Sequence, residues 1–277
     1  SDWLLETITY LDRVVLHDVD IALKGFNREI YIRSREGEPW QIISDSGIKT
    51  VKFPIYMVNE DHAEIIENRL NLGGQYSGDI RTDDFYARLY LAIPGLDMAN
   101  YMPDLRIGNH MVTTSNLSSQ VWIEAMSSEI NITGDLRLSS VILQNETLLD
   151  QANLVFRYEG PKFSAGSVAI PFVELIQGDI NYRLTDILGA FEVGPKGIAV
   201  AAEVPIVDVE NLVDLLQFAV SKQILPRKLS ATLKELNPKG KLQKVTFLAD
   251  RSGGQPVMAC RLSEFSIDAH FGIPAIK

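Results

Sequence analysis

Apolar and polar residues alternate along much of this chain. In FYARLYLAI (residues 85–93) every second residue from Phe85 onward is apolar, and the residues between them include Tyr86 and Arg88. The same alternation is found in HDVDIAL (17–23), DINYRL (179–184), GIAVAAEV (197–204) and FSIDAHF (265–271). Alternation of this kind is typical of β-strands that have one apolar and one polar face. Gly-Gly, Gly-Asp and Gly-Pro pairs separate the segments, so the pattern predicts a mainly β chain with about a dozen strands or more.

Two segments have helical rather than strand periodicity. Residues 207–222 (VDVENLVDLLQFAVSK) place apolar side chains at i, i+3, i+4 and i+7, with Asp208 in position to cap the first turn. A shorter helix is predicted over residues 96–105 (LDMANYMPDL), with Asp97 as its cap. Residues 59–71 (NEDHAEIIENRLN) fit either a helix or a strand, and we favour a strand. The chain therefore has few helices with which to cover a sheet.

The openings of the two predicted helices resemble each other. PGLDMANY (94–101) aligns with PIVDVENL (205–212), and each of them follows a clear strand. This similarity indicates an internal repeat with units at about 76–144 and 178–249, although two short capped helices can also be alike by chance. A long repeat built of strands is typical of an elongated array. We therefore predict one elongated β-rich segment over residues 1–277.

Composition and charge narrow the possible partners. The chain has 277 residues, of which 46% are hydrophobic, and this is enough for a sizeable core. Its net charge of -10 argues against nucleic acid as the main partner, because phosphate backbones are bound by basic surfaces. The same charge argues against a broad electrostatic attachment to anionic membranes.

One part of the sequence has the opposite charge. From Lys222 to Lys244 there are seven basic residues and a single acidic one, Glu235. Such a strip could bind a phosphate-bearing head group or an acidic partner, or it could simply be an exposed surface. The residues we assign to this basic strip are Arg227, Lys228, Lys239, Lys241 and Lys244.

Residues suited to catalysis or metal binding are sparse. The sequence has one cysteine, Cys260, and four histidines, without the spacing of a known metal or nucleophile motif. Asp18 and Asp20 lie on one face of a strand, as a magnesium site requires, but they also fit an ordinary solvated face. We therefore predict no catalytic residues, no metal, no cofactor and no enzymatic activity.

One motif is more specific. The pattern L-P…L-x-x-x-L-x-x-L-x-P-x-G-x-L runs from Leu225 to Leu242, with helical spacing before Pro238 and alternation after Gly240. It describes a short helix, a Pro-Gly stop and a strand. Together with the strand and helix of residues 78–103, this motif resembles the AsmA-like superfamily, in particular the YhdP branch of large envelope proteins. In that family an L-x-P-x-G-x-L turn recurs after a short helix.

The resemblance implies a fold, a place and a function. Such proteins are anchored in the inner membrane of Gram-negative bacteria and are mostly periplasmic, and a long curved β-sheet forms an apolar groove for phospholipid acyl chains. This chain would be a periplasmic fragment of such a protein. Its partners would be phospholipid or another acyl lipid, the rest of its own longer membrane-anchored chain, and envelope proteins. The expected fold is a mainly β, elongated, U-shaped and largely antiparallel sheet with an apolar groove and a few short helices.

The residues support a groove in one independent respect. Many strands are apolar on one face, and a sheet must cover such a face with a second sheet, a helix layer, its own curvature or a ligand. We predict non-enzymatic binding and conduction of phospholipid along this face. The predicted lining residues are Leu89, Leu91, Ile93, Ile123, Leu136, Leu138, Ile180, Tyr182, Leu184, Ile198, Val200, Phe265, Ile267 and Phe271.

Two other functions fit the sequence. The first is a structural or assembly scaffold of the cell envelope made of closed β-sandwich modules, which would have a solid core and no groove. The second is a glycan hydrolase, which would need two carboxylates about 5–10 Å apart in a cleft. The chain has many acidic residues, and no pair among them is singled out by its spacing.

Overall fold

A single open β-sheet makes up most of the described chain, which we analyse in a computed structural model. The structure describes residues 11–25, 28–59, 68–79, 82–98, 106–107, 110–143, 146–161, 164–194, 197–249 and 256–268. Within these residues 16 strands form one antiparallel sheet, accompanied by two helices. The prediction of a mainly β, curved and open sheet with a few short helices is confirmed.

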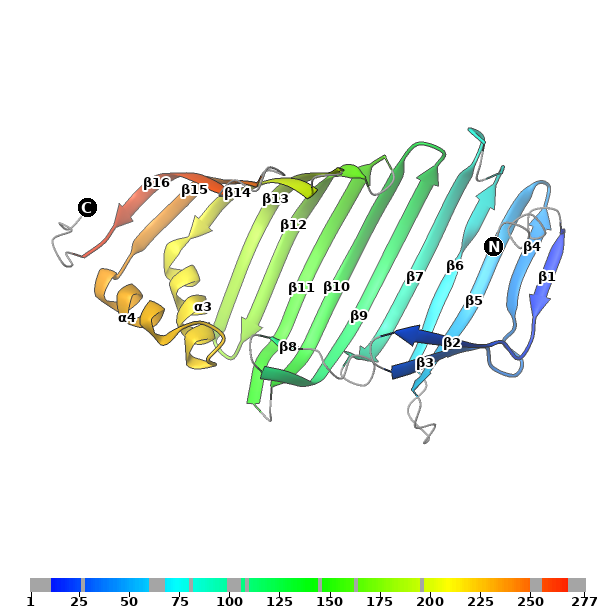
Figure 1. Cartoon of the computed structure of the whole chain (residues 1–277), viewed down its shortest axis with the longest axis horizontal. Coiled ribbons are helices and arrows are strands. Elements are labelled where there is room, and N and C mark those ends of the chain that lie inside the picture. The colour runs from blue at the N-terminus through cyan, green and yellow to red at the C-terminus, as the bar shows by residue number, and fades with distance from the viewer. Residues whose placement is uncertain are drawn as a thin grey trace.

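The strands follow one another along the sheet almost in sequence order (Figure 1). The first six are β1 (Arg13–Leu16), β2 (Asp20–Gly25), β3 (Arg28–Arg33), β4 (Trp40–Asp45), β5 (Ile48–Asn59) and β6 (Asn68–Ser77). The next six are β7 (Tyr86–Asp97), β8 (Arg106–Ile107), β9 (His110–Met126), β10 (Ile130–Leu143), β11 (Glu146–Gly160) and β12 (Ala165–Gln177). The last four are β13 (Ile180–Gly194), β14 (Gly197–Asp208), β15 (Lys239–Ala249) and β16 (Val257–Ser266).

The strand order gives the sheet a single long path. It runs β1-β4-β5-β6-β7-β9-β10-β11-β12-β13-β14-β15-β16, while β2, β3 and β8 lie off this path. Thirteen of the 16 strands therefore stand side by side from one end of the sheet to the other. Because neighbouring strands in a sheet are about 4.8 Å apart, thirteen strands span roughly 58 Å.

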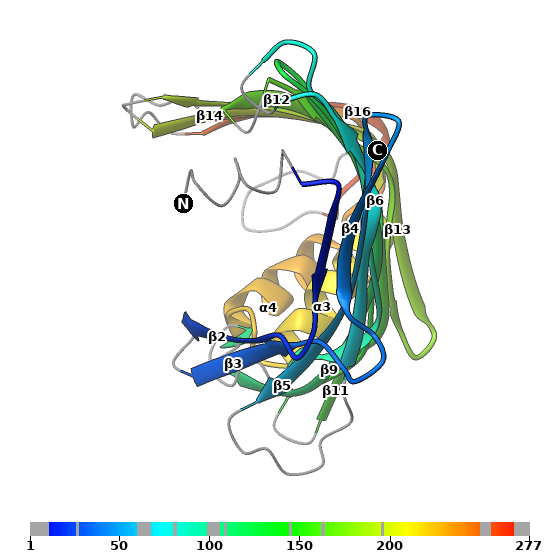
Figure 2. The same cartoon turned by 90° about the vertical axis from the view of Figure 1, so that its right-hand side faces the viewer.

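The strands are strongly bent along their length (Figure 2). Figure 2, which looks along the length of the sheet, shows it as a C-shaped curve with the two helices on its inner side. Irregularities in strand pairing occur between Ile93 and Leu96 and between Val155 and Arg157. A β-bulge bends the strand that contains it and increases its twist, so these irregularities favour the curvature.

The helices α3 (Val209–Ser221) and α4 (Arg227–Leu236) lie between β14 and β15. The carboxylate of Asp208 accepts a hydrogen bond from the Asn211 backbone nitrogen at 3.1 Å, and this caps α3 as predicted. Asn237 ends α4 in the left-handed conformation, with φ 43°. The sequence of helix, stop and strand expected from the motif is therefore present.

Most of the shorter predicted helix lies outside the described residues. Leu96 belongs to β7, which ends at Asp97, Met98 is helical, and residues 99–105 are not described. The Asp97 carboxylate accepts a hydrogen bond from the Ser115 backbone nitrogen on β9 at 3.3 Å, and its role as a helix cap stays a prediction. The internal repeat stays a prediction for the same reason. Of the ambiguous residues 59–71, residues 60–67 lie outside the described residues, so the choice between helix and strand there stays a prediction; Asn59 ends β5 and residues 68–71 begin β6.

A compact apolar cluster joins α3 to the sheet. Val112, Val141, Leu143 and Leu148, on β9 to β11, are at most 5% exposed. Phe218 of α3 packs against this cluster, as do Leu138, Leu149 and Ile224. Since Figure 2 places α3 inside the curve, this cluster belongs to the concave side of the sheet.

Candidate functional site

The pairing of the strands sorts the side chains onto two faces of different character. Residues directly opposite each other on antiparallel strands point to the same side of a sheet. Starting from Leu89, which pairs with Ile123, this rule links one residue on each of the thirteen strands. We call this line the apolar row: Val14, Ile42, Val51, Gly74, Leu89, Ile123, Ile132, Tyr158, Val168, Gly189, Ala202, Phe247 and Met258. The row contains no charged side chain.

The apolar row lies on the concave face. Leu138 shares a face with Ile132, six residues earlier on the same strand β10, because side chains alternate along a strand. Leu138 packs against the same buried cluster as Phe218 of α3. The helix lies inside the curve (Figure 2), so the face that carries Leu138 and the apolar row is the inner one. We call this inner face the trough.

The outer, convex face is polar along most of its length. One line of paired residues on that face runs Thr50, Gln75, Arg88, Glu124, Asn131, Glu159 and Ser167. Within it the Arg88 Nε lies 2.8 Å from the Glu124 Oε1. Towards the C-terminal end the line becomes apolar, at Ala190, Ala201, Leu248 and Val257. The contrast between the two faces explains the alternation in the sequence.

Apolar side chains in the trough are not sealed. Ile198 is 56% exposed, Val200 37%, Phe247 38% and Met258 70%. These residues lie on β14 to β16, beyond the part of the sheet where Phe218 of α3 packs against the buried cluster. Apolar side chains that stay exposed together on one surface are a mark of interaction sites for proteins, membranes or ligands.

Most predicted lining residues share the trough. Pairing places these on the concave face: Leu89, Leu91, Ile93, Ile123, Leu136, Leu138, Ile180, Tyr182, Leu184, Ile198 and Val200. Phe265 lies near the end of β16 and Ile267 follows this strand, both after an irregularity in its pairing with β15, so pairing assigns them to neither face. Phe271 lies outside the described residues.

Aromatic rings pack closely against glycines in the trough. A Cβ atom on Gly134 would come within 2.8 Å of the Phe156 ring, and one on Gly166 within 2.4 Å of the Tyr158 ring. The Tyr158 and Phe191 rings stack with their centroids 5.9 Å apart. Sequence reasoning missed these pairs, although a glycine inside a strand is a signal of close approach. The glycines leave room for a smooth apolar surface.

Tyr182 connects the trough to the start of α3. It is 6% exposed, and burial together with the negative charge of Asp208 raises its pKa above 10.0. The phenol is therefore neutral at physiological pH, which suits an apolar surface.

The basic strip is divided into two groups. Arg227 and Lys228 lie in the first turn of α4, whereas Lys239, Lys241 and Lys244 lie on β15. The ten residues of α4 separate the groups by roughly 15 Å along the helix axis, at about 1.5 Å per residue. All five side chains are exposed. The strip is thus not one continuous surface along the chain.

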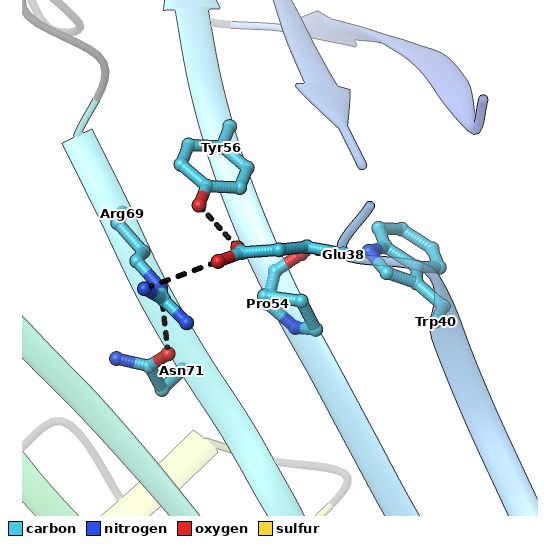
Figure 3. A network of polar contacts seen from close by, with 6 residues as sticks. All are labelled: Glu38, Trp40, Pro54, Tyr56, Arg69 and Asn71. Atoms are coloured by element: carbon cyan, nitrogen blue, oxygen red, sulfur yellow. Dashed lines mark hydrogen bonds and ion pairs between the residues drawn. The ribbon is translucent and has the colours of Figure 1, made fainter. Parts of the chain in front are cut away.

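A polar network near the N-terminal end has a structural role (Figure 3). The Tyr56 hydroxyl donates a hydrogen bond to Glu38, whose other carboxylate oxygen lies 3.5 Å from the Arg69 guanidinium. Arg69 Nε in turn donates to Asn71 Oδ1 at 3.1 Å. Burial, followed by the bond to Glu38, raises the pKa of Tyr56 above 10.0. The network ties the turn that contains Glu38 to β5 and β6.

Groups suited to chemistry do not gather in the described part of the chain. There, no three His, Cys, Asp or Glu side chains are close enough together to hold a metal ion. Asp20, one of the two carboxylates considered for magnesium, pairs with Arg33 at 3.1 Å. Cys260 is exposed. Neither α3 nor α4 is long and apolar enough to cross a bilayer.

Comparisons with known proteins add no relative. No protein-family model, no curated protein and no solved structure matches this chain.

Proposed function

We propose that this chain is a non-enzymatic lipid carrier, in which the trough binds the acyl chains of phospholipid or a similar lipid and conducts them along its length. The observation that supports this proposal is the apolar row, which crosses all thirteen side-by-side strands without a charged residue. A trough roughly 58 Å long is far longer than a site for one small molecule needs to be.

The energetic basis is the removal of apolar surface from water. Each methylene group that leaves water contributes about 0.8 kcal/mol to binding. The trough supplies matching apolar surface, since residues such as Ile198 and Phe247 are 56% and 38% exposed without a ligand. Apolar contacts are not directional, so an acyl chain bound in this way is not fixed to one position along the apolar row.

The proposal extends to the cellular location of the protein. The helix, Pro-Gly stop and strand between Leu225 and Leu242 resemble the AsmA-like superfamily, YhdP branch. On that resemblance we propose that the chain is a periplasmic part of a membrane-anchored protein that carries lipid between two membranes. Envelope proteins would be its further partners.

The scaffold alternative depended on closed β-sandwiches. Within the described residues there is one open sheet, with α3 and α4 on its concave side, instead of two sheets packed face to face. The geometry therefore favours lipid carriage over a solid scaffold.

A crosslinking experiment tests the proposal. Val200 and Ala201 are neighbours on β14 whose side chains point to the concave and convex faces, respectively. A photoreactive benzoylphenylalanine at position 200 should crosslink phospholipid during expression in a Gram-negative host, and the same group at position 201 should not. Native mass spectrometry of the purified protein should also show bound lipid. Equal crosslinking at both positions, or none at either with no lipid in the spectrum, would contradict the proposal.

A further inference from the structure

A small cleft lies between the end of α3 and one face of α4. Its volume is about 430 Å³, and Val220, Ser221 and Gln223 line one side of it. The other side is formed by α4, where Arg227, Ser230 and Lys234 follow i, i+3, i+7 spacing and therefore share one face of the helix. The cleft is thus built from two helices that the sequence places next to each other.

The charge of this cleft is positive. Arg227 and Lys234 both line it, and none of its lining residues is acidic. In the described part of the chain neither of these two side chains forms an ion pair. The cleft is therefore a local site for an anion.

The spacing of the donors suits an anion with several oxygens. Arg227 and Lys234 are seven residues apart, roughly 10 Å along the helix axis, and Ser230 lies between them. Their long side chains can reach over Ser230 from both ends. The Gln223 amide and the Ser230 hydroxyl add uncharged donors. Arginine and lysine together bind phosphate well, because a guanidinium donates in a fork and an ammonium acts as a point charge.

The cleft lies beside the concave face of the sheet. Gln223 lines the cleft, and the next residue, Ile224, packs against the apolar cluster of the concave face. Figure 2 shows α3 and α4 inside the curve of the sheet. A molecule with a phosphate in the cleft would therefore have the apolar trough beside it. This combination of surfaces is complementary to an anionic phospholipid.

We propose that the α3–α4 cleft binds the phosphate of a lipid whose acyl chains lie in the trough. This inference rests on the proposed function. It adds a fixed binding site for the lipid head group beside the trough. This site is formed by Arg227, Lys234, Ser230 and Gln223. Free phosphate has the same chemistry as the lipid head group, so the experiment must separate the two sources.

Calorimetric titrations of the folded chain provide the test. The probes are inorganic phosphate, sn-glycerol 3-phosphate and monomeric dihexanoylphosphatidylglycerol. The short-chain lipid should bind at least tenfold more tightly than either free phosphate compound, since its acyl chains reach the trough. The double variant Arg227→Gln/Lys234→Gln should weaken lipid binding at least tenfold. The matched control is Lys228→Gln/Lys239→Gln, which removes two exposed charges outside the cleft and should change binding less than twofold.

Each other outcome overturns the inference in a recognisable way. Equal loss in the two double variants would mean that only general charge attracts the lipid. Equal affinity for inorganic phosphate and lipid would assign the cleft to free phosphate. Absence of binding by all three probes would remove the anion site. The crosslinks at position 200 are measured separately, so they test whether the trough binds lipid independently of whether the cleft binds phosphate.

Discussion

A charge placed in the trough should block lipid at that position. Phe247 and Leu248 are neighbours on β15, with Phe247 in the apolar row and Leu248 on the convex face. They are 38% and 54% exposed, so neither is part of a sealed core. Phe247→Asp and Leu248→Asp therefore introduce the same carboxylate at adjacent positions on opposite faces. The first variant should lose lipid binding near β15, and the second should not.

The expected magnitude follows from the exposed area of Phe247. A phenylalanine side chain has roughly 200 Å² of surface, and the 38% that is exposed corresponds to about 75 Å². Covering this area with an acyl chain stabilises the complex by about 2 kcal/mol at 25 cal/mol per Å². Its loss corresponds to a roughly 30-fold weaker affinity. Removing water from the new carboxylate costs further free energy, so 30-fold is a lower bound.

The native cysteine allows a local assay. Cys260 is exposed, is the sole cysteine of the chain and lies two residues from Met258, the partner of Phe247 on β16. A polarity-sensitive fluorophore on Cys260, titrated with a short-chain phospholipid, should report the affinity at this end of the trough. Urea unfolding of both variants controls for stability. The reasoning is refuted if Leu248→Asp weakens binding as much as Phe247→Asp, or if neither variant changes it.

Three further predictions concern stability and use urea unfolding. Because Tyr56 has a raised pKa, its neutral form contributes to the free energy of unfolding below pH 10, and this contribution should decline as the pH rises above 10. The variant Tyr56→Phe should show a smaller decline of stability over the same pH range. An unchanged pH profile in this variant would contradict the role assigned to Tyr56. Gly134→Ala should lower the free energy of unfolding by about 1–3 kcal/mol, because the added methyl group collides with the Phe156 ring. An unchanged free energy of unfolding would show that the ring can move away freely. Asp208→Ala should lower the free energy of unfolding by about 1 kcal/mol, because α3 loses its N-terminal cap. The control variant Asp208→Asn keeps a capping side chain and should leave the stability nearly unchanged.

Much of the fold follows from local sequence patterns. The alternating segment 85–93 lies almost entirely in β7, and the helical segment 207–222 contains α3. These patterns succeed because each strand buries one face and each helix one stripe, and the period of the apolar residues records this directly. Asp97 shows what a local pattern leaves out. A carboxylate after Pro-Gly-Leu fits a helix cap, and Met98 after it is helical, but the hydrogen bond from the Ser115 backbone nitrogen on β9 to this carboxylate joins residues 18 apart and leaves no mark in the local pattern.

The sequence predicts which residues of a strand lie together on the apolar face, but it does not predict how the sheet curves around them. Alternation identifies which residues of a strand share a face, and so Leu89 and Leu91 could be grouped from the sequence. Which face is concave depends on bulges and on where α3 packs, and both arise from contacts between distant residues. The α3–α4 cleft was missed for the same reason, since Gln223 and Lys234 come together only through the turn between the helices.

The absence of charge from the apolar row has a consequence for how a lipid would move along it under the proposed function. Each step from one strand to the next, about 4.8 Å, offers a hydrocarbon tail nearly the same surroundings, from Leu89 to Ile123 to Ile132. Away from the α3–α4 cleft, these steps break no polar contacts, so the energy profile for a bound acyl chain would be shallow. Under the proposed function, a lipid would move along this part of the trough by one-dimensional diffusion. Its net direction would be set by the supply of lipid at one end and its removal at the other.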